Sequence, residues 1–388
     1  MLNFTSEGVD SPYQEKQYDR DLLAKKAQIE LLQNPNFLLL YVPGDGSKMK
    51  VVKPANDSYH RGRIMESSIN EGSDRLSLPH YALSHLWGIS EENPHLWHDI
   101  GDFVEDENGQ PADIVSMRPE KRDTLLKLLE HHPDSYWWID VLCARADTPL
   151  DIMGDIYKHC RTCYAMLDCE SHIISDIQSL VTCEDRIPRT VDGFWHAARV
   201  WETFTRCAWW KRVWTWQEMM LPKQVLLIAE TETHVWNTID MDHLFPLRQK
   251  AFRPFTTTVP VEVREQWRSS PSYSRVNEIN YCTHQRSDFQ RLGPPSFIAI
   301  NTLKRSSRRC MKPEDYVYGV LGVLQFKLPR GIEPNELWQL FVSQVDEALK
   351  DSGFAGVGPH AREFNLLAAR DMADVFLALL ENENDHIS

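Results

Sequence analysis

Hydrophobic residues in the first part of the chain gather into short runs that alternate with amphipathic stretches. The apolar runs have the length and the β-branched and aromatic content of buried strands, and they lie at 36–43, 81–88, 136–143, 163–168 and 224–229. The stretches between them space their apolar positions as helices do, at 120–132, 149–160, 191–208 and 209–220. Strands and helices that alternate at these lengths predict an α/β protein with a parallel sheet.

The flanking parts of the chain have different patterns. Residues 13–33 predict a charged helix, and residues 44–79, which are polar and rich in Gly, Ser, Asn and Lys, predict a loop or excursion. Beyond about residue 240 the pattern becomes mostly helical. We therefore predict an α/β domain at 78–240, preceded by a helix and loop extension at 1–77 and followed by a mostly helical region at 241–388 that packs on it.

The charge and composition of the chain indicate which classes of partner and which compartment to expect. The chain has 388 residues, with 42 Lys and Arg against 56 Asp and Glu, for a formal net charge of −14. Such an acidic chain is a poor binder of nucleic acid or anionic membranes. It has no apolar run near the ~18 residues of a membrane helix, and its start does not have the pattern of a signal peptide. Eight scattered cysteines fit free thiols in a reducing compartment, so we expect a cytoplasmic protein.

Common cofactor and metal motifs do not occur in the sequence. There is no phosphate-binding loop, no dinucleotide-binding glycine motif and no G-x-S-x-G nucleophile motif. Cys160, Cys163, Cys169 and His172 have a spacing that resembles a compact zinc set. A strand at 163–168 would nevertheless hold Cys163 and Cys169 ~20 Å apart. We therefore expect buried thiols there, no metal and no bound cofactor.

Ser84, Asp140 and Glu218 are the candidate site residues. Ser84 ends a strand, Asp140 lies within an apolar strand, and Glu218 lies on a helix that follows a later strand. Ligands in α/β folds bind beyond the carboxyl ends of the strands, where these side chains would converge. Each residue also has a purely structural interpretation. Ser84 could satisfy local backbone groups, Asp140 could cap a neighbouring loop, and Glu218 could form a salt bridge to an adjacent helix.

The surroundings of Glu218 are unusually rich in tryptophan, as the segment RCAWWKRVWTWQEMMLP at 206–222 shows. On a continuous helix, Glu218 shares a face with Trp214 and Lys211. Trp214 would shield the carboxylate and raise its pKa, whereas Lys211 or Arg212 would lower that pKa. A carboxylate in this position could accept a ribose hydroxyl or stabilise a cationic sugar transition state during glycosidic cleavage.

These elements together resemble a known family. The blocks of the fungal HET (heterokaryon incompatibility) domain are similar, in the same order, to YALSHLWG at 81–88, YWWIDVLC at 136–143, MGDIYKHC at 153–160 and WWKRVWTWQE at 209–218. A further block that often follows the domain is similar to KPEDYVYGVLGV at 312–323. Each block is short, but their shared order makes the resemblance specific over about residues 80–325.

The resemblance implies a cytosolic protein that recognises non-self partners and triggers cell death after hyphal fusion, by contact with other incompatibility proteins or by self-association. The family is held to be distantly similar to TIR domains, which have a flavodoxin-like sheet. Some TIR domains cleave NAD at its glycosidic bond with a helix glutamate, which Glu218 matches here. NAD would then be a substrate, acted on by Glu218 with Ser84 and Asp140 nearby. The residues expected to contact the nucleotide are Trp87, Gly88, Arg212 and Trp214.

One segment departs from the family pattern. After the Trp-Ile-Asp strand the family usually continues with an Asn-Gln pair and an acidic stretch, whereas this chain has Ala144 and Arg145 and is about six residues shorter. Because that loop would flank the strand ends, three interpretations stay open. The domain could signal by oligomerisation without catalysis, it could hydrolyse NAD or a related nucleotide, or it could serve other small-molecule chemistry.

Overall fold

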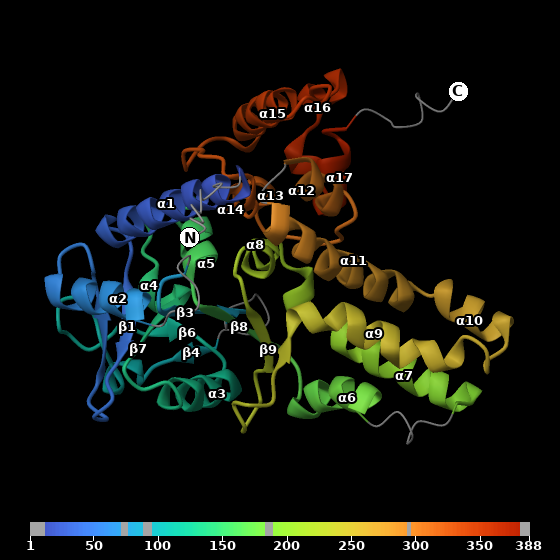
Figure 1. The fold of residues 1–388 in the computed structure, drawn as a ribbon, viewed down its shortest axis with the longest axis horizontal. Coiled ribbons are helices and arrows are strands. Elements are labelled where there is room, and N and C mark those ends of the chain that lie inside the picture. Colours follow the sequence, from blue (N-terminus) through green and yellow to red (C-terminus); the bar gives the residue numbers. More distant parts are fainter. Residues whose placement is uncertain (1–11, 71–76, 88–94, 183–188, 293–295, 381–388) are drawn as a thin grey trace, which may run out of the picture.

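A computed structural model describes residues 12–70, 77–87, 95–182, 189–292 and 296–380 (Figure 1). Its main sheet has eight strands in the spatial order β10-β9-β8-β3-β7-β1-β2-β5. In chain order the strands of this sheet are β1 Leu39–Val42, β2 Met49–Val52, β3 His80–His85, β5 Val104–Glu105, β7 Ser135–Ile139, β8 Thr162–Leu167, β9 Val225–Ala229 and β10 Ile239–Asp240. Two further strands, β4 Leu96–Trp97 and β6 Val115–Ser116, pair with each other.

The centre of the sheet is parallel, since β3 pairs in parallel with both β7 and β8, and β8 pairs in parallel with β9. Numbered along the chain from β3, these four strands have the order second, first, third, fourth, which is the start of the flavodoxin-like doubly wound order. Every residue of β7 and β8 is buried, as expected for strands covered on both faces. The prediction of an α/β fold with a parallel sheet is confirmed.

Helices cover both faces of the sheet. Those before β10 are α1 Pro12–Gln33, α2 Ser58–Asn70, α3 Pro119–Glu130, α4 Asp140–Cys143, α5 Asp151–His159, α6 Ser171–Thr182, α7 Val191–Thr205 and α8 Thr215–Met220, with a 3₁₀ turn, η2, at Ala208–Lys211. Figure 1 draws α1, α5 and α8 along one side of the sheet, and α3 and α6 along the other.

The remainder of the chain is mostly helical, as predicted. Its helices are α9 Leu244–Phe252, α10 Val261–Arg268, α11 Pro271–Leu292, α12 Ser296–Leu303, α13 Asp315–Tyr318, α14 Leu321–Leu324, α15 Pro334–Asp351, α16 Pro359–Glu363 and α17 Met372–Leu377. In Figure 1, α9 and α11 lie beyond β9 beside α7, while α15 and α16 lie at the top of the molecule.

The structure corrects three local predictions. Residues 44–79 are not only a loop, because they contain β2 and α2. Asp140 is the first residue of the short helix α4 rather than a residue within a strand, since the strand ends at Ile139. The helix predicted at 209–220 is interrupted, because Arg212 is extended and pairs with Arg309 in an isolated β-bridge. The boundaries proposed for three regions of the chain stay predictions.

Candidate functional site

Ser84 and Glu218 form a buried hydrogen-bonded pair at the carboxyl end of β3. The Ser84 hydroxyl donates to Oε2 of Glu218, and it accepts a hydrogen bond of 2.8 Å from Nε1 of Trp209 in η2. Ser84 is completely buried, and Glu218 is 7% exposed. The hydroxyl therefore does not bond to local backbone, and it links the central strand to the tryptophan-rich segment.

Burial changes the acid–base behaviour of Glu218. Removal from water raises the pKa of its carboxyl to about 7, while the hydrogen bond from Ser84 and the charges of Arg212 and Arg308 act in the opposite direction. The charge of Asp140 adds a smaller upward contribution. Near neutral pH, Glu218 is thus divided between its protonated and ionised forms, which is the condition that suits a general acid or base.

The short helix that carries Glu218 is anchored by α11. Arg286 is completely buried, and its Nε donates to the carbonyl of Met219 over 2.8 Å. The same guanidinium donates to the carbonyls of Pro222 and Lys223, just beyond the helix. These bonds satisfy carbonyl groups that a helix of six residues leaves without partners at its end, and they place a positive charge where the helix dipole favours it.

Asp140 directly follows β7, the strand paired with β3, and lies in a cluster with His85 and Trp87. Nε2 of His85 lies 2.8 Å from Oδ1 of Asp140, and Nε1 of Trp87 donates to Oδ2. Burial raises the pKa of Asp140, but the charge and hydrogen bond of His85 outweigh it, so the pKa is lowered. Asp140 therefore remains ionised and ties the segment after β3 to α4. This is close to the loop-capping role that the sequence left open.

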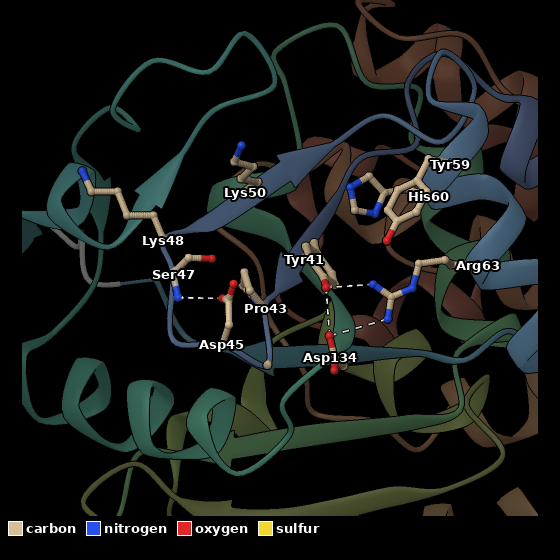
Figure 2. A pocket seen from close by; sticks show the side chains of 11 residues that line it. Tyr41, Pro43, Asp45, Ser47, Lys48, Lys50, Tyr59, His60, Arg63 and Asp134 are labelled. Carbon is tan, nitrogen blue, oxygen red and sulfur yellow. Dashed lines mark hydrogen bonds and ion pairs between the residues drawn. The ribbon is translucent and has the colours of Figure 1, made fainter.

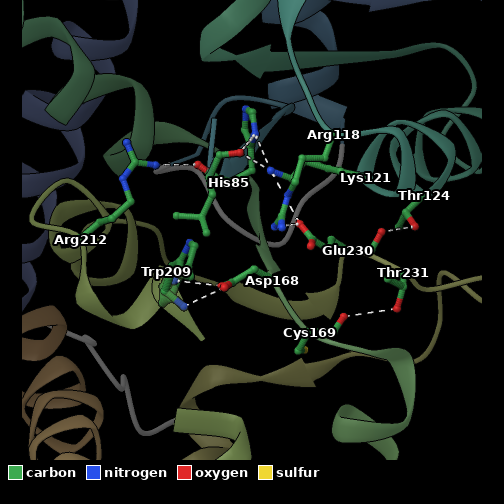
Figure 3. A network of polar contacts seen from close by, with 12 residues as sticks. His85, Arg118, Lys121, Thr124, Asp168, Cys169, Trp209, Arg212, Glu230 and Thr231 are labelled. Atoms are coloured by element: carbon green, nitrogen blue, oxygen red, sulfur yellow. Dashed lines mark hydrogen bonds and ion pairs between the residues drawn. The ribbon is translucent and has the colours of Figure 1, made fainter. Parts of the chain in front are cut away.

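A network of polar and charged side chains connects His85 with Lys121 and Arg118 near α3 (Figure 3). Nζ of Lys121, in α3, donates to the carbonyl of Leu86 and lies 3.5 Å from Nδ1 of His85. The same Nζ is 3.8 Å from Oε2 of Glu230, which also pairs with Arg118. Burial lowers the pKa of Lys121 to about 8, against the charge of Glu230. Burial also lowers the pKa of His85, against the charge of Asp140 and the hydrogen bond between the two side chains.

Sequence reasoning did not identify Lys121, Glu230 or His85 as parts of this cluster. Lys121 lies in an amphipathic helix among other charged residues, a pattern that normally indicates a solvated position. It is completely buried, because the end of β9 brings Glu230 beside it. The only signal in the sequence was the position of His85 beside the strand-end serine.

Of the four residues predicted to contact a nucleotide, some lie at the candidate site and others do not. Nη1 of Arg212 donates to the carbonyl of His85 over 3.1 Å, so it lies at the site. Trp87 is 52% exposed, and its indole contacts Asp140. Trp214 immediately precedes α8, and its indole hydrogen-bonds to the side chain of Asp315. Gly88 falls outside the described residues.

Trp209 takes the place that the sequence analysis gave to Trp214. Because the helix begins only at Thr215, Trp214 and Glu218 do not share a continuous helix. The indole that bonds to the pair is that of Trp209, a completely buried residue. Asp168, which follows β8, accepts hydrogen bonds from the backbone N–H groups of Ala208 and Trp209 and so fixes η2 (Figure 3). Lys211 is exposed.

The pair therefore lies at a defined position in the fold. The chain leaves β3 toward β7 on one side and returns to β8 on the other, so the order of the sheet reverses between β3 and β8. Doubly wound sheets bind their ligands outside this reversal point, at the carboxyl ends of the strands. Ser84 contributes from β3, and Asp168 follows β8. Residues from three further elements, η2, α8 and α4, complete the site.

Within the described residues, no group of three or more His, Cys, Asp and Glu side chains is arranged to hold a metal ion. None of the helices described is long and apolar enough to span a membrane.

This geometry defines an α/β protein with a buried acidic site at the reversal point of its sheet. Residues 80–218 match the family model described as heterokaryon incompatibility protein (HET). The match begins at the first residue of β3 and ends at Glu218, so it contains Ser84, Asp140 and Glu218. The chain thus carries a heterokaryon incompatibility domain, as the sequence blocks indicated. No curated protein and no solved structure matches it.

Proposed function

We propose that this protein acts in non-self recognition and cell death during heterokaryon incompatibility, and that its domain does so by hydrolysing the N-glycosidic bond of NAD or a related nucleotide. The observation that carries the chemical part is the hydrogen bond between Ser84 and Glu218. This bond fixes the carboxyl of Glu218 at the reversal point of a doubly wound sheet, where ligands bind. Burial raises the pKa of the same carboxyl, and a strongly perturbed pKa is frequent at functional sites.

In this proposal, ionised Glu218 interacts with the ribose as positive charge develops on its anomeric carbon. The bond from that carbon to the nicotinamide nitrogen breaks, a water oxygen bonds to the carbon, and the water releases a proton. Ser84 and Trp209 hold the carboxylate in place. Exposure increases from Glu218 at 7%, through the Asp140 side chain at 16%, to Trp87 at 52%. This gradient indicates the side from which a substrate would approach.

The test is incubation of the purified protein with NAD, with release of nicotinamide followed by chromatography. Glu218→Gln keeps the shape of the side chain and removes its charge, so activity should fall on the order of 10²-fold or more. Glu262→Gln, on an exposed position of α10, is the matched control and should keep full activity. Activity that survives in folded Glu218→Gln protein would remove Glu218 from the mechanism.

A second candidate function is signalling by self-association without catalysis. The complete burial of Ser84 favours it, because a serine that bonds only inside the protein can serve to lock η2 and α8 in place. In this case the protein releases no nicotinamide, and its oligomeric state changes on contact with a partner. Light scattering during mixing, together with the chromatographic assay, separates the two candidates.

A further inference from the structure

A cavity lies at the opposite end of the sheet from Ser84. It has a volume of about 610 Å³, within the range of small-molecule sites. Its walls come from the turn between β1 and β2, from the start of α2 and from Asp134, which immediately precedes β7 (Figure 2). Asp134 marks the amino end of β7, whereas Ser84 lies near the carboxyl end of the parallel strand β3. The two sites are therefore separate.

The floor of this cavity is a closed network. The Tyr41 hydroxyl donates to Oδ1 of Asp134 over 2.9 Å and accepts from Nη1 of Arg63 over 2.8 Å. Nη2 of Arg63 lies 3.5 Å from the same carboxylate oxygen. Figure 2 shows all three side chains pointing to one place. Because the charges of Arg63 and Asp134 compensate each other, the floor is close to neutral.

Lys48 and Lys50 supply positive charge above this floor. Lys48 lies just before β2 and Lys50 lies in β2, and both side chains line the cavity. Lys50 lies directly opposite Tyr41 in the strand register, and its Nζ is 3.4 Å from Glu105, which is outside the cavity lining. Nζ of Lys48 donates to the carbonyl of Gly101 over 3.1 Å, and no carboxylate among the described residues lies within ion-pair distance of it. The lining carries three cations, Lys48, Lys50 and Arg63, against the two carboxylates of Asp45 and Asp134, so a small excess of positive charge remains.

The rim of the cavity carries an exposed aromatic ring. Tyr59 is 66% exposed, and its ring meets that of His60 edge-on with centroids 5.1 Å apart. The guanidinium of Arg63 lies 5.9 Å from the Tyr59 centroid, which holds the ring beside the floor. Its open face can stack against the ring of a ligand. Across the cavity, Asp45 presents a carboxylate, fixed by the N–H of Ser47, that can accept a sugar hydroxyl.

We propose that this cavity binds a phosphate ester of a ring-bearing small molecule, such as a sugar phosphate or a nucleotide. The phosphate lies against Lys48 and Lys50, and the ring or sugar lies between Tyr59 and Asp45. A neutral floor, a cationic wall and an aromatic rim match the three parts of such a ligand. This site is independent of the proposed glycosidic cleavage and uses none of its residues.

Isothermal titration calorimetry with AMP, ribose 5-phosphate, adenosine and inorganic phosphate tests the proposal. Both esters should bind, and adenosine and inorganic phosphate should bind at least about tenfold more weakly. Lys48→Ala and Lys50→Ala should each weaken the binding of both esters by about tenfold or more, since a hydrogen bond to a charged group contributes about that much. Tyr59→Ala should weaken it to a smaller extent.

Lys127→Ala, on an exposed position of α3, is the control and should leave binding unchanged. The altered side chains are largely solvent-facing, so these variants should fold. Glu218→Gln should also bind the esters normally, and a loss in that variant would place the ligand at the other site and overturn the proposal. Equal binding of adenosine or of inorganic phosphate would overturn it as well, as would esters that bind Lys48→Ala and Lys50→Ala unchanged.

Discussion

Gly154 of α5 and Gly322 of α14 meet backbone to backbone. A Cβ atom added to either glycine would lie 2.4 Å from the Cα atom of the other. The added atom on Gly322 would also lie 2.9 Å from Oε1 of Gln217, the residue before Glu218. Two glycines therefore allow the C-terminal helical region to approach the family-matched part of the chain directly behind the candidate site.

Replacing either glycine with alanine should be strongly destabilising. The new methyl group meets backbone, which cannot move aside as a flexible side chain can, so Gly154→Ala and Gly322→Ala should each cost about 1–3 kcal/mol or more. Chemical denaturation measures the loss. Gly62→Ala in α2 is the matched control, because nothing lies within 4 Å of its added Cβ and alanine favours helix. That variant should be neutral or slightly more stable, and equal losses at all three positions would contradict the close-contact explanation.

The stability of the protein should depend on pH through Glu218. Its pKa is raised to about 7 in the folded protein, whereas the ordinary value is 4.5. The folded state therefore binds the proton more tightly, and the stabilisation is complete below about pH 4.5 and is lost as the pH rises through 7. This difference corresponds to roughly 3 kcal/mol. Thermal unfolding should show Glu218→Gln gaining stability over the wild type between pH 5 and pH 8, and a constant difference would contradict the raised pKa.

Trp209 should influence the same titration indirectly. Its indole N–H donates to the Ser84 hydroxyl, which in turn donates to Glu218. Trp209→Phe keeps most of the ring and removes the donor, which weakens the polarisation of Ser84 and makes the ionised carboxylate less favourable. The midpoint of the pH-dependent stability change should move to a higher pH. A downward shift would show that the indole does not support the ionised form.

Arg286 should be essential for the position of α8. Arg286→Met keeps a long side chain but removes the donor to the carbonyls of Met219 and Lys223 and the ion-pair partner of Asp242, so it should cost about 3 kcal/mol or more. Arg268→Met is a control on the exposed pair with Glu265 and should change stability by less than about 1 kcal/mol. Urea unfolding compares the two variants. Similar small losses would mean that Gln290, which donates to the carbonyl of Met220, anchors the helix without Arg286.

The central strands could be predicted from sequence because each contains a continuous apolar run, such as YWWI at 136–139 in β7. The proximity of Ser84 and Glu218 followed from the rule that α/β folds gather side chains at the carboxyl ends of strands. Their functional roles remain predictions. By contrast, β2 is only four residues long, and α2 contains a glycine and many polar residues, so neither has a strong periodic signal.

The buried charges could not be predicted for a different reason. Arg286, Arg308 and Lys121 are completely buried, yet charged side chains are nearly always exposed unless a partner accompanies them. Their partners are backbone carbonyls or side chains distant in sequence, such as the carbonyl of Trp210 for Arg308. A pattern of residue types along one chain does not carry that information.

The family match starts at His80, yet the sheet does not start there. On the side away from β3, β7 is paired with β1, which comes from residues upstream of the match. Cut at the family boundary, the protein would expose the edge of β7, whose sequence SYWWI is apolar and aromatic, and such an edge invites strands of other molecules to pair with it. The upstream strand β1 therefore covers an edge that would otherwise favour pairing between molecules, and the folded sheet extends beyond the segment that the family model matches.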